Sequence, residues 1–405
     1  MSVRWAHSWP WRGGCGCWTG YPGGRPAAVR VSFAPRAAVT RPSAAMVPSV
    51  MTSVSSAWIV SASMPMKGAV CRWSWPPNMG PGRRRASGGR GMVMPPETRI
   101  SRRRVLRLSA VALAGAGVAL WPRQPSPVTW TGQAMGGPAS LTLHGVEQGV
   151  ALRLVSRVVA LVDAMEGLFS LHRPDSLLSR LNREGEVGDP PAAFTDLLRQ
   201  ALSVAAATGG AFDPTVQPLW DLYRGEAPEA ETLHAAMGTV GWWRVEVARD
   251  RVRLAPGTQL TLNGIAQGYI TDRVTDLLLS HGVGHMLVDM GEPRGIGRRG
   301  DGQEWQLGIA DPDAVGRILS TVPVSGRAIA TSAPRGTLID AAGRFGHILD
   351  PVVGRPATAW RQVSVAAATA TMADAISTAI AAAAPARAAS LIGDSGAAVV
   401  MGVVA

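Results

Sequence analysis

The sequence predicts an α+β (mixed α/β) fold, in which helices pack on a mixed sheet within a single large domain. Strand-like segments come in runs that are interrupted by isolated helical segments, and they do not alternate with helices in even β–α units. About 280 residues follow residue 123, enough for one large domain or two tightly joined halves. No internal repeat or linker-like stretch divides residues 124–405, which we therefore treat as one domain.

Apolar residues at helical spacing identify the helices, and alternation or short apolar runs between turn residues identify the strands. The first half is predicted to hold two strands over 128–144 around the turn Met135-Gly136-Gly137-Pro138, and helices over 146–169, from about Asp175 to Asn182, and over 192–208. The second half is predicted to hold strands over 245–248, 252–255, 259–262, 286–290, 304–310, 328–332, 338–340, 362–367 and 397–404, and helices over 265–280, 372–382 and 387–391.

The stretch from Thr261 to Arg273 combines a strand end, glycines and a helix start. Leu260–Leu262 is predicted to be a strand, and Asn263 suits the N-cap of the helix that follows. Gly264 and Gly268 have no Cβ, so another backbone or a ligand can come close. A helix start after a glycine-rich turn is a possible anion site. The alternative is an ordinary strand-to-helix joint with glycines for tight packing.

The charge of the chain is unevenly distributed. The formal net charge is +12, but residues 1–107 hold 17 of the 40 Lys and Arg residues and one acid, Glu97. The remaining residues carry 23 basic and 27 acidic side chains, a net charge of −4, which argues against nucleic acid as a partner. All three cysteines also lie early in the chain, which excludes cysteine catalysis, disulfides and thiolate metal sites from the domain.

Residues 1–91 differ in composition from the rest of the chain. Arg, Gly, Pro, Ser and Trp dominate, half of the 14 tryptophans lie there, and no helical or strand period is visible. Frequent tryptophan is unusual for disorder, so we interpret this segment as a non-native upstream translation, with the true start at Met92 or Met94. The alternative is a genuine disordered extension.

Residues 92–123 are predicted to form a signal segment. The stretch Ser101–Leu120 places adjacent arginines before a 13-residue apolar run that is too short to span a bilayer comfortably. SRRRVLR resembles the twin-arginine export consensus, with Val105 and Arg107 as departures. The sequence thus predicts export by the twin-arginine route, to the periplasm or to a membrane-anchored position outside the cytoplasm. The membrane would be contacted only through this segment, if it is retained.

Two small groups of polar residues could carry chemistry. Asp374 and Thr378 are four residues apart on an otherwise apolar helix, where a hard cation with oxygen ligands could compensate the carboxylate. The alternative is a solvent-facing aspartate and a threonine bonded to its own helix. His347 precedes Asp350 by three residues in a loop and could accept a proton near neutral pH, or could be purely structural. Asp213, after a Gly-Gly turn, is a weaker candidate.

Five motifs in this order resemble the FAD:protein FMN transferase (ApbE-like) family. They are MGGP at Met135, TGGAFDPTVQPLW at Thr208, LNGIAQGYITDR at Leu262, HILDPVVGRP at His347 and MADAISTAI at Met372. SLHRPDSLLSRLN at Ser170 and LVDMGEPRGIG at Leu287 match more weakly. The resemblance spans roughly residues 130–405 and implies an ApbE-like, T-fold-related architecture.

The resemblance implies an activity and a set of site residues. The family binds FAD and Mg²⁺ outside the cytoplasmic membrane, cleaves the diphosphate, and transfers FMN to a Thr or Ser hydroxyl of an exported or membrane-bound acceptor protein, releasing AMP. Carried over by position, His347 would be the base that acts on the acceptor hydroxyl. The backbone carbonyl of Gly264 would hold the metal together with Asp374 and Thr378. As a ligand of the catalytic metal, Asp374 would also be a catalytic residue. The expected FAD contacts are Met135, Ala211, Phe212, Asp213, Thr261, Gln267, His347 and Ile348.

The sequence departs from the family pattern at four places. Thr261 stands where an acid is usual, and Gln267 stands where lysine is usual. Ala333 replaces a glycine, and Met290-Gly291-Glu292 replaces a Gly-Gly-Asp turn. These departures motivate two alternatives to FMN transfer: an FAD-binding protein without transfer activity, and an FAD diphosphatase that releases FMN and AMP.

Overall fold

The computed structural model describes residues 57–58, 126–393 and 395–405. The predictions for residues 1–91 and 92–123 therefore lie outside the described residues, apart from the short strand β1 (Ala57–Trp58), which pairs with β9. Within these ranges, no helix is both long enough and apolar enough to cross a membrane.

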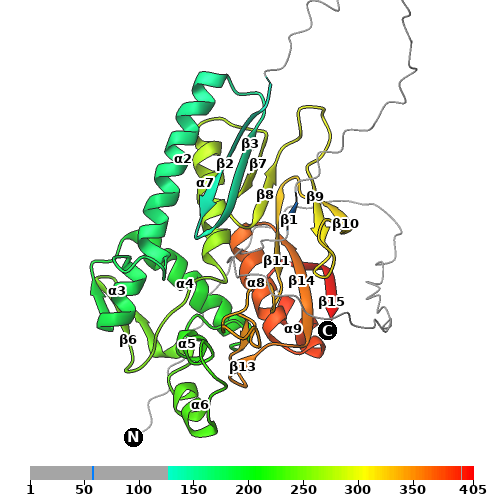
Figure 1. Ribbon diagram of the computed structural model, residues 1–405. Helices are drawn as coiled ribbons and strands as arrows, with labels where there is room; N and C mark the ends of the chain where they lie inside the picture. The colour runs from blue at the N-terminus through cyan, green and yellow to red at the C-terminus, as the bar shows by residue number, and fades with distance from the viewer. Residues whose placement is uncertain (1–56, 59–125, 394) are drawn as a thin grey trace, which may run out of the picture. The chain divides into compact units, whose positions relative to one another are not determined.

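A seven-stranded sheet forms the centre of the structure, and it is antiparallel at each of its pairings (Figure 1). Its spatial order is β15 (Ala398–Val404), β14 (Trp360–Ala367), β11 (Arg327–Ser332), β8 (Pro293–Ile296), β7 (Met286–Asp289), β3 (Gly137–Leu143) and β2 (Val128–Ala134). Smaller sheets are formed by β1 with β9 (Gln306–Ala310) and β10 (Ile318–Pro323), by β4 (Glu186–Gly188) with β6 (Arg251–Leu254) and β5 (Val245–Val247), and by the hairpin of β12 (Leu349–Asp350) and β13 (Arg355–Pro356).

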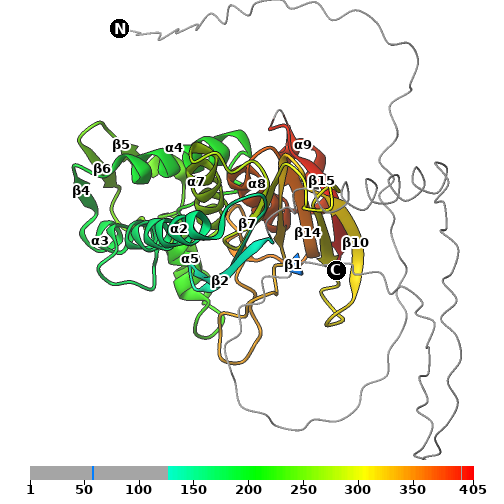
Figure 2. The same cartoon turned by 90° about the horizontal axis from the view of Figure 1, so that it is seen from above.

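Helices α2 (Gln148–Phe169), α7 (Ala266–Ser280) and α8 (Ala370–Ala382) cover one face of the large sheet, and β9 and β10 lie on the other side (Figure 2). The second face is closed by a separate apolar cluster that includes Trp305, Leu307 and Ile329. The other α-helices within the described residues are α3 (Leu177–Glu184), α4 (Ala192–Ala207), α5 (Gln217–Leu222), α6 (Ala230–Met237) and α9 (Ala388–Ile392). This combination confirms the predicted α+β fold, but the large sheet is antiparallel and not mixed as predicted.

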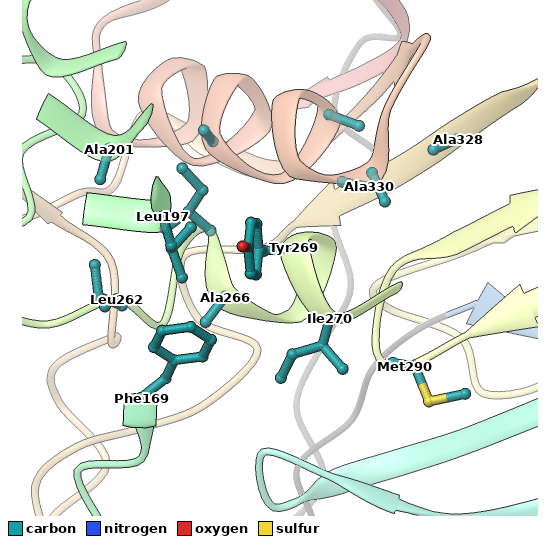
Figure 3. Packing of buried hydrophobic residues seen from close by; sticks show 14 of the residues in the cluster. Phe169, Leu197, Ala201, Leu262, Ala266, Tyr269, Ile270, Met290, Ala328 and Ala330 are labelled. Atoms are coloured by element: carbon teal, nitrogen blue, oxygen red, sulfur yellow. The ribbon is translucent and has the colours of Figure 1, made fainter. Parts of the chain in front are cut away.

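The main core surrounds α7 (Figure 3). The Tyr269 ring meets the Phe169 ring edge-on at a centroid distance of 5.8 Å, and its hydroxyl donates to Asp196 at 3.0 Å. Phe169 in turn stacks on Phe194, at 6.2 Å. Burial of these large rings fixes the start of α7 against α2 and α4, which is where the glycine-rich stretch lies.

Helices α7 and α8 approach each other closely at Gly268. A Cβ at this position would lie 2.3 Å from the carbonyl oxygen of Ala370, a distance that real Cβ atoms do not adopt. The contact is between two backbones, so neither side can yield without moving a helix. The predicted packing role of this glycine is therefore confirmed.

Replacing Gly268 by alanine is expected to destabilise the protein by about 1–3 kcal/mol, because the added methyl group overpacks the contact between the helices. Urea unfolding of the domain measures the change. The matched control is Gly167→Ala in α2, where an added Cβ meets nothing within 4 Å and alanine favours the helix. Equal stability of the two variants would show that the α7–α8 contact tolerates separation.

The hairpin and the longer helices agree with the prediction, and the glycine-rich stretch differs from it. Leu260–Leu262 is not a strand: the Asn182 side chain accepts from the Leu260 N–H at 2.7 Å and donates to its carbonyl at 2.8 Å. Asn263 is not the N-cap, because a turn over 262–265 precedes α7 and Ile265 occupies the cap position. Residues 338–340 form only an isolated bridge to Gly346.

Candidate active site

A cavity of about 600 Å³ opens beside the start of α7 and the side of α8 that faces it. The segments that line it are far apart in the sequence, and the fold of α7 and α8 on the sheet brings them together. Ten of the eleven residues that the resemblance implies line this cavity: Ala211, Phe212, Asp213, Thr261, Gly264, Gln267, His347, Ile348, Asp374 and Thr378.

Met135 is the eleventh residue that the resemblance implies, and it does not line the cavity. It lies in the turn between β2 and β3, outside the cavity lining, and its N–H donates to Glu166 Oε1 at 2.6 Å. Its contact with a flavin nucleotide stays a prediction.

Oxygen donors from α8 and from the turn before α7 meet at one wall of the cavity. Asp374 is 4% exposed, and its Oδ2 accepts from the Gly268 N–H at 3.1 Å. Thr378 lies so close to Gly264 that a Cβ there would be 3.0 Å from the Thr378 hydroxyl oxygen. Because Asp374 already takes one N–H of the first turn of α7, the predicted anion site at this helix start is partly filled by the protein itself.

Three carboxyl groups lie near this wall without a basic partner in the part of the chain that the structure describes. Burial, together with the charge of Asp272, raises the pKa of Asp374 to about 7. Burial raises the pKa of Asp289 to about 6. The pKa of Glu292 is raised well above its usual value by burial first and then by Asp374 and Asp289. Each group is therefore easier to protonate than an exposed acid.

Glu292 is a site residue that the sequence reasoning missed, although the altered turn around it was noted as a departure. It lines the cavity and accepts from the Thr331 N–H at 3.3 Å. A Cβ at Gly291 would lie 2.4 Å from Gln267 Nε2, so the neutral Gln267 side chain packs on the same turn. Gln267, which stands where lysine is usual, thus contacts the residue before Glu292, and no ion pair to Glu292 is formed within the described residues.

The metal-free protein is expected to lose stability as the pH rises from about 4 to about 7. The raised pKa values mean that the folded state binds more protons than the unfolded state in this window, so folding is favoured at its acidic end. Glu292→Gln should flatten the decline, because it removes one of the buried charges. Thermal midpoints in chelator from pH 4.5 to 8 measure this, with exposed Glu231→Gln as the control. A flat wild-type profile would contradict the prediction.

His347 is held as a neutral base. Burial lowers its pKa, and Nδ1 lies 3.2 Å from the carbonyl oxygen of Thr337. A carbonyl only accepts, so Nδ1 carries the proton and Nε2 keeps its lone pair. Among the described residues no hydrogen bond joins His347 to Asp350: Asp350 Oδ1 accepts from the N–H groups of Val352 and Val353, at 2.8 and 3.3 Å, and serves its own turn.

Asp213 lines the cavity, but both of its oxygens accept hydrogen bonds from other parts of the protein. Oδ1 accepts from the Thr215 N–H at 2.9 Å and from the Thr215 hydroxyl at 2.6 Å, and Oδ2 accepts from the Trp242 N–H at 3.0 Å. Burial raises its pKa, against these hydrogen bonds. Asp213 therefore shapes the turn that presents Ala211 and Phe212.

Further lining residues come from α3 and from α5 with the turn after it, and they were not predicted as site residues. The Arg224 guanidinium lies 5.5 Å from the Trp220 ring centroid, in a cation–π arrangement. The motif TGGAFDPTVQPLW contains part of α5, but a helix of six residues is too short to show a helical period. The lining residues on this side are Ser179, Asn182, Arg183, Gln217, Trp220, Asp221 and Arg224.

A cavity that joins a neutral histidine to a set of hard oxygen donors is consistent with an enzyme that transfers phosphoryl-type groups. The chain belongs to the ApbE family, whose model matches residues 135–401. It is 28% identical, over 72% of its length and 89% of the relative, to the FAD:protein FMN transferase of Klebsiella pneumoniae. It is 32% identical to that of Treponema pallidum, over 56% of this chain and 70% of the relative.

A solved structure has the same fold. The flavinyl transferase ApbE of Pseudomonas stutzeri, in its apo form, is similar with a TM-score of 0.61 and 28% identity, over 69% of this chain and 91% of that one. The match covers most of the described domain.

Proposed function

We propose that this protein is an FAD:protein FMN transferase, which moves the FMN unit of FAD to a threonine or serine hydroxyl of an acceptor protein. The observation that carries the proposal is that one cavity joins a neutral histidine to a hard oxygen donor set, within a chain of the ApbE family. The cavity volume of about 600 Å³ is in the range of cofactor-binding sites.

His347 acts on the acceptor. Its Nε2 takes the proton of the acceptor hydroxyl while the hydroxyl oxygen forms a bond to the phosphorus of the FMN half. The bond between that phosphorus and the bridging oxygen of the diphosphate breaks, and AMP leaves with the bridging oxygen. The Thr337 carbonyl holds the imidazole in the tautomer that this step needs, and it stabilises the imidazolium that forms.

The donor set fits a magnesium ion. Asp374 supplies a carboxylate, Thr378 a hydroxyl and Gly264 a backbone carbonyl, all of them hard oxygen ligands. Among the described residues no group of three or more His, Cys, Asp or Glu side chains is arranged to hold a metal. A site with a single carboxylate is consistent with magnesium, which keeps waters and substrate oxygens as ligands. When bound, the ion would neutralise charge on the diphosphate.

The location of the reaction follows from the predicted signal segment. We propose that residues 92–123 direct export by the twin-arginine route, so that the acceptor is an exported or membrane-bound protein. Fractionation of cells that express the chain from Met92, with and without substitution of Arg102 and Arg103 by lysine, tests this export.

The deciding experiment measures the acceptor's intact mass. Residues 124–405 are incubated with FAD, Mg²⁺ and an acceptor domain that the Klebsiella pneumoniae relative is first shown to modify. A gain of one FMN unit that chelator abolishes supports the transferase. Free FMN and AMP without a mass gain of the acceptor support the diphosphatase. Bound FAD without release of AMP supports an FAD-binding protein without transfer activity, the alternative that the replacement of lysine by Gln267 motivates.

A further inference from the structure

We propose that Ser332 is a positioning residue of the metal site: it accepts the hydroxyl proton of Thr378 and thereby leaves the lone pairs of the Thr378 oxygen for a divalent cation. The inference rests on the proposed function, because it concerns the metal site of that function. Ser332 is the last residue of β11 and lines the cavity. Thr378 lies in α8, which packs on β11.

Three hydroxyl groups and one carbonyl form a row of polar contacts between β11 and α8. The Ser377 hydroxyl donates to the carbonyl oxygen of Asp374, three residues earlier in the helix, at 3.0 Å. The hydroxyl oxygens of Ser332 and Ser377 are 2.8 Å apart, and those of Ser332 and Thr378 are 3.4 Å apart, the longest contact of the row. Ser377 is fully buried, so its proton has only protein oxygens as partners.

The chemistry of the hydroxyl group gives this row a direction. A hydroxyl has one proton and two lone pairs, and a carbonyl oxygen only accepts. Because the Ser377 proton goes to the Asp374 carbonyl, Ser377 can only accept from Ser332. The Ser332 proton is then used on Ser377, so Ser332 presents a lone pair to Thr378. The two shorter contacts of the row therefore decide the polarity of the longest one.

This polarity suits a threonine that binds a cation. The threonine oxygen uses a lone pair for the cation, and its proton has to point at another acceptor. A Ser332 proton directed at Thr378 would occupy one of these lone pairs and bring partial positive charge toward the cation. The row excludes that arrangement, and within the described residues no other group donates a hydrogen bond to the Thr378 hydroxyl oxygen.

The row also connects the two side chains that would hold the metal. Its final carbonyl belongs to Asp374, whose carboxylate accepts from the Gly268 N–H. Thr378 lies one helical turn later, and a Cβ at Gly264 would be 3.0 Å from its hydroxyl oxygen. Thr378 is thus contacted both by the turn before α7 and by the end of β11. Residues that orient a metal ligand in this way commonly change metal affinity by 10–100-fold.

The test measures metal affinity in the absence of FAD and acceptor. The probe is the Mn²⁺ ion alone, which takes the same oxygen ligands as Mg²⁺ and whose unbound fraction is measured by electron paramagnetic resonance. We expect Ser332→Ala to raise the Kd for Mn²⁺ at least about tenfold. The matched control is Ser364→Ala, a fully buried serine of β14 whose hydroxyl oxygen lies 2.9 Å from that of Thr331. It loses a similar hydroxyl pair outside the row and should keep the wild-type Kd within about twofold.

A double-mutant cycle shows whether Ser332 acts through Thr378. In Thr378→Val the ligand hydroxyl is already gone, so the further change Ser332→Ala should leave the Kd for Mn²⁺ within about twofold. An equal increase in both backgrounds overturns the inference. Ser377→Ala is read in addition, and it decides the matter if Thr378→Val binds no Mn²⁺. It releases the Ser332 proton and should raise the Kd as Ser332→Ala does, whereas an unchanged Kd overturns the inferred polarity of the row.

The outcomes separate this role from the proposed function. FMN transfer by wild type, together with an unchanged Kd for Mn²⁺ in Ser332→Ala, overturns the role of Ser332 and leaves the transferase intact. A raised Kd in Ser332→Ala, with no FMN transfer by wild type, supports the role of Ser332 and overturns the transferase. An equal rise of the Kd in Ser364→Ala, or no binding of Mn²⁺ by wild type at millimolar concentration, overturns the inference.

Discussion

Replacing Asp374 by asparagine is expected to lower FMN transfer by about 10²–10³-fold and, at the same time, to stabilise the metal-free protein above pH 7. The two effects have one cause. The carboxylate is buried, accepts a single hydrogen bond among the described residues, and has a pKa raised to about 7. Its charge is unfavourable until a cation is bound, and asparagine removes both the penalty and the ligand.

The measurement pairs kinetics with denaturation. Transfer is followed over a Mg²⁺ titration at saturating FAD, and the thermal midpoint is recorded in chelator at pH 8. Asp250→Asn, an exposed aspartate, is the control and should change neither quantity. Turnover that is unchanged in Asp374→Asn would remove this residue from the metal site. Lost turnover together with a lower midpoint would mean that Asp374 mainly holds α7 and α8 together through Gly268.

Replacing His347 by alanine is expected to slow transfer by about 10²–10⁴-fold, with a much smaller effect on FAD affinity. Burial keeps the imidazole neutral, and the Thr337 carbonyl places its proton on Nδ1, so that Nε2 carries the lone pair. Its pKa is lowered, so in wild type the base is active above that pKa and is lost as the pH falls through it. The acidic limb of the wild-type pH–rate profile should therefore lie below pH 6.5.

Two readouts distinguish a base from a pocket residue. The acidic limb should disappear from the profile of His347→Ala, and FAD binding, measured by quenching of flavin fluorescence, should remain close to wild type. Equal losses of transfer and FAD affinity would show that His347 only shapes the cavity. A retained acidic limb would assign it to a different group.

The sequence predicted most of the fold because its longer elements carry their own signals. Helix α2 spans 22 residues and buries Leu154, Val158 and Met165 on one face, a pattern visible without any tertiary knowledge. The β2–β3 hairpin was predicted in the same way, from alternation around a glycine turn. Helices α5 and α6 were missed, since α5 has only six residues and α6 buries none of its side chains, so that neither shows a clear apolar face.

The strand and the N-cap predicted for the glycine-rich stretch were wrong because local sequence patterns do not contain the distant hydrogen-bond partners. Leu260 and Leu262 are buried, as in a strand, but Asn182 from α3, 78 residues away, supplies the hydrogen bonds that a neighbouring strand would have made. Asn263 was a sound N-cap by type, yet the turn over 262–265 already satisfies the first N–H groups. Both outcomes depend on partners that a local window of sequence does not contain.

The sequence by itself determined the α+β class, the acidic domain without thiols, and the ordered motifs that placed ten residues around one cavity. Only the tertiary structure decided how those residues are used. It engages Asp350 and Asp213 in hydrogen bonds within the protein, fixes the proton of His347 on Nδ1, and packs the neutral Gln267 against Gly291, the residue before Glu292. The physical reason is that hydrogen-bond partners and pKa values depend on burial and on neighbours that are distant in the chain, whereas residue types and helical periods are local.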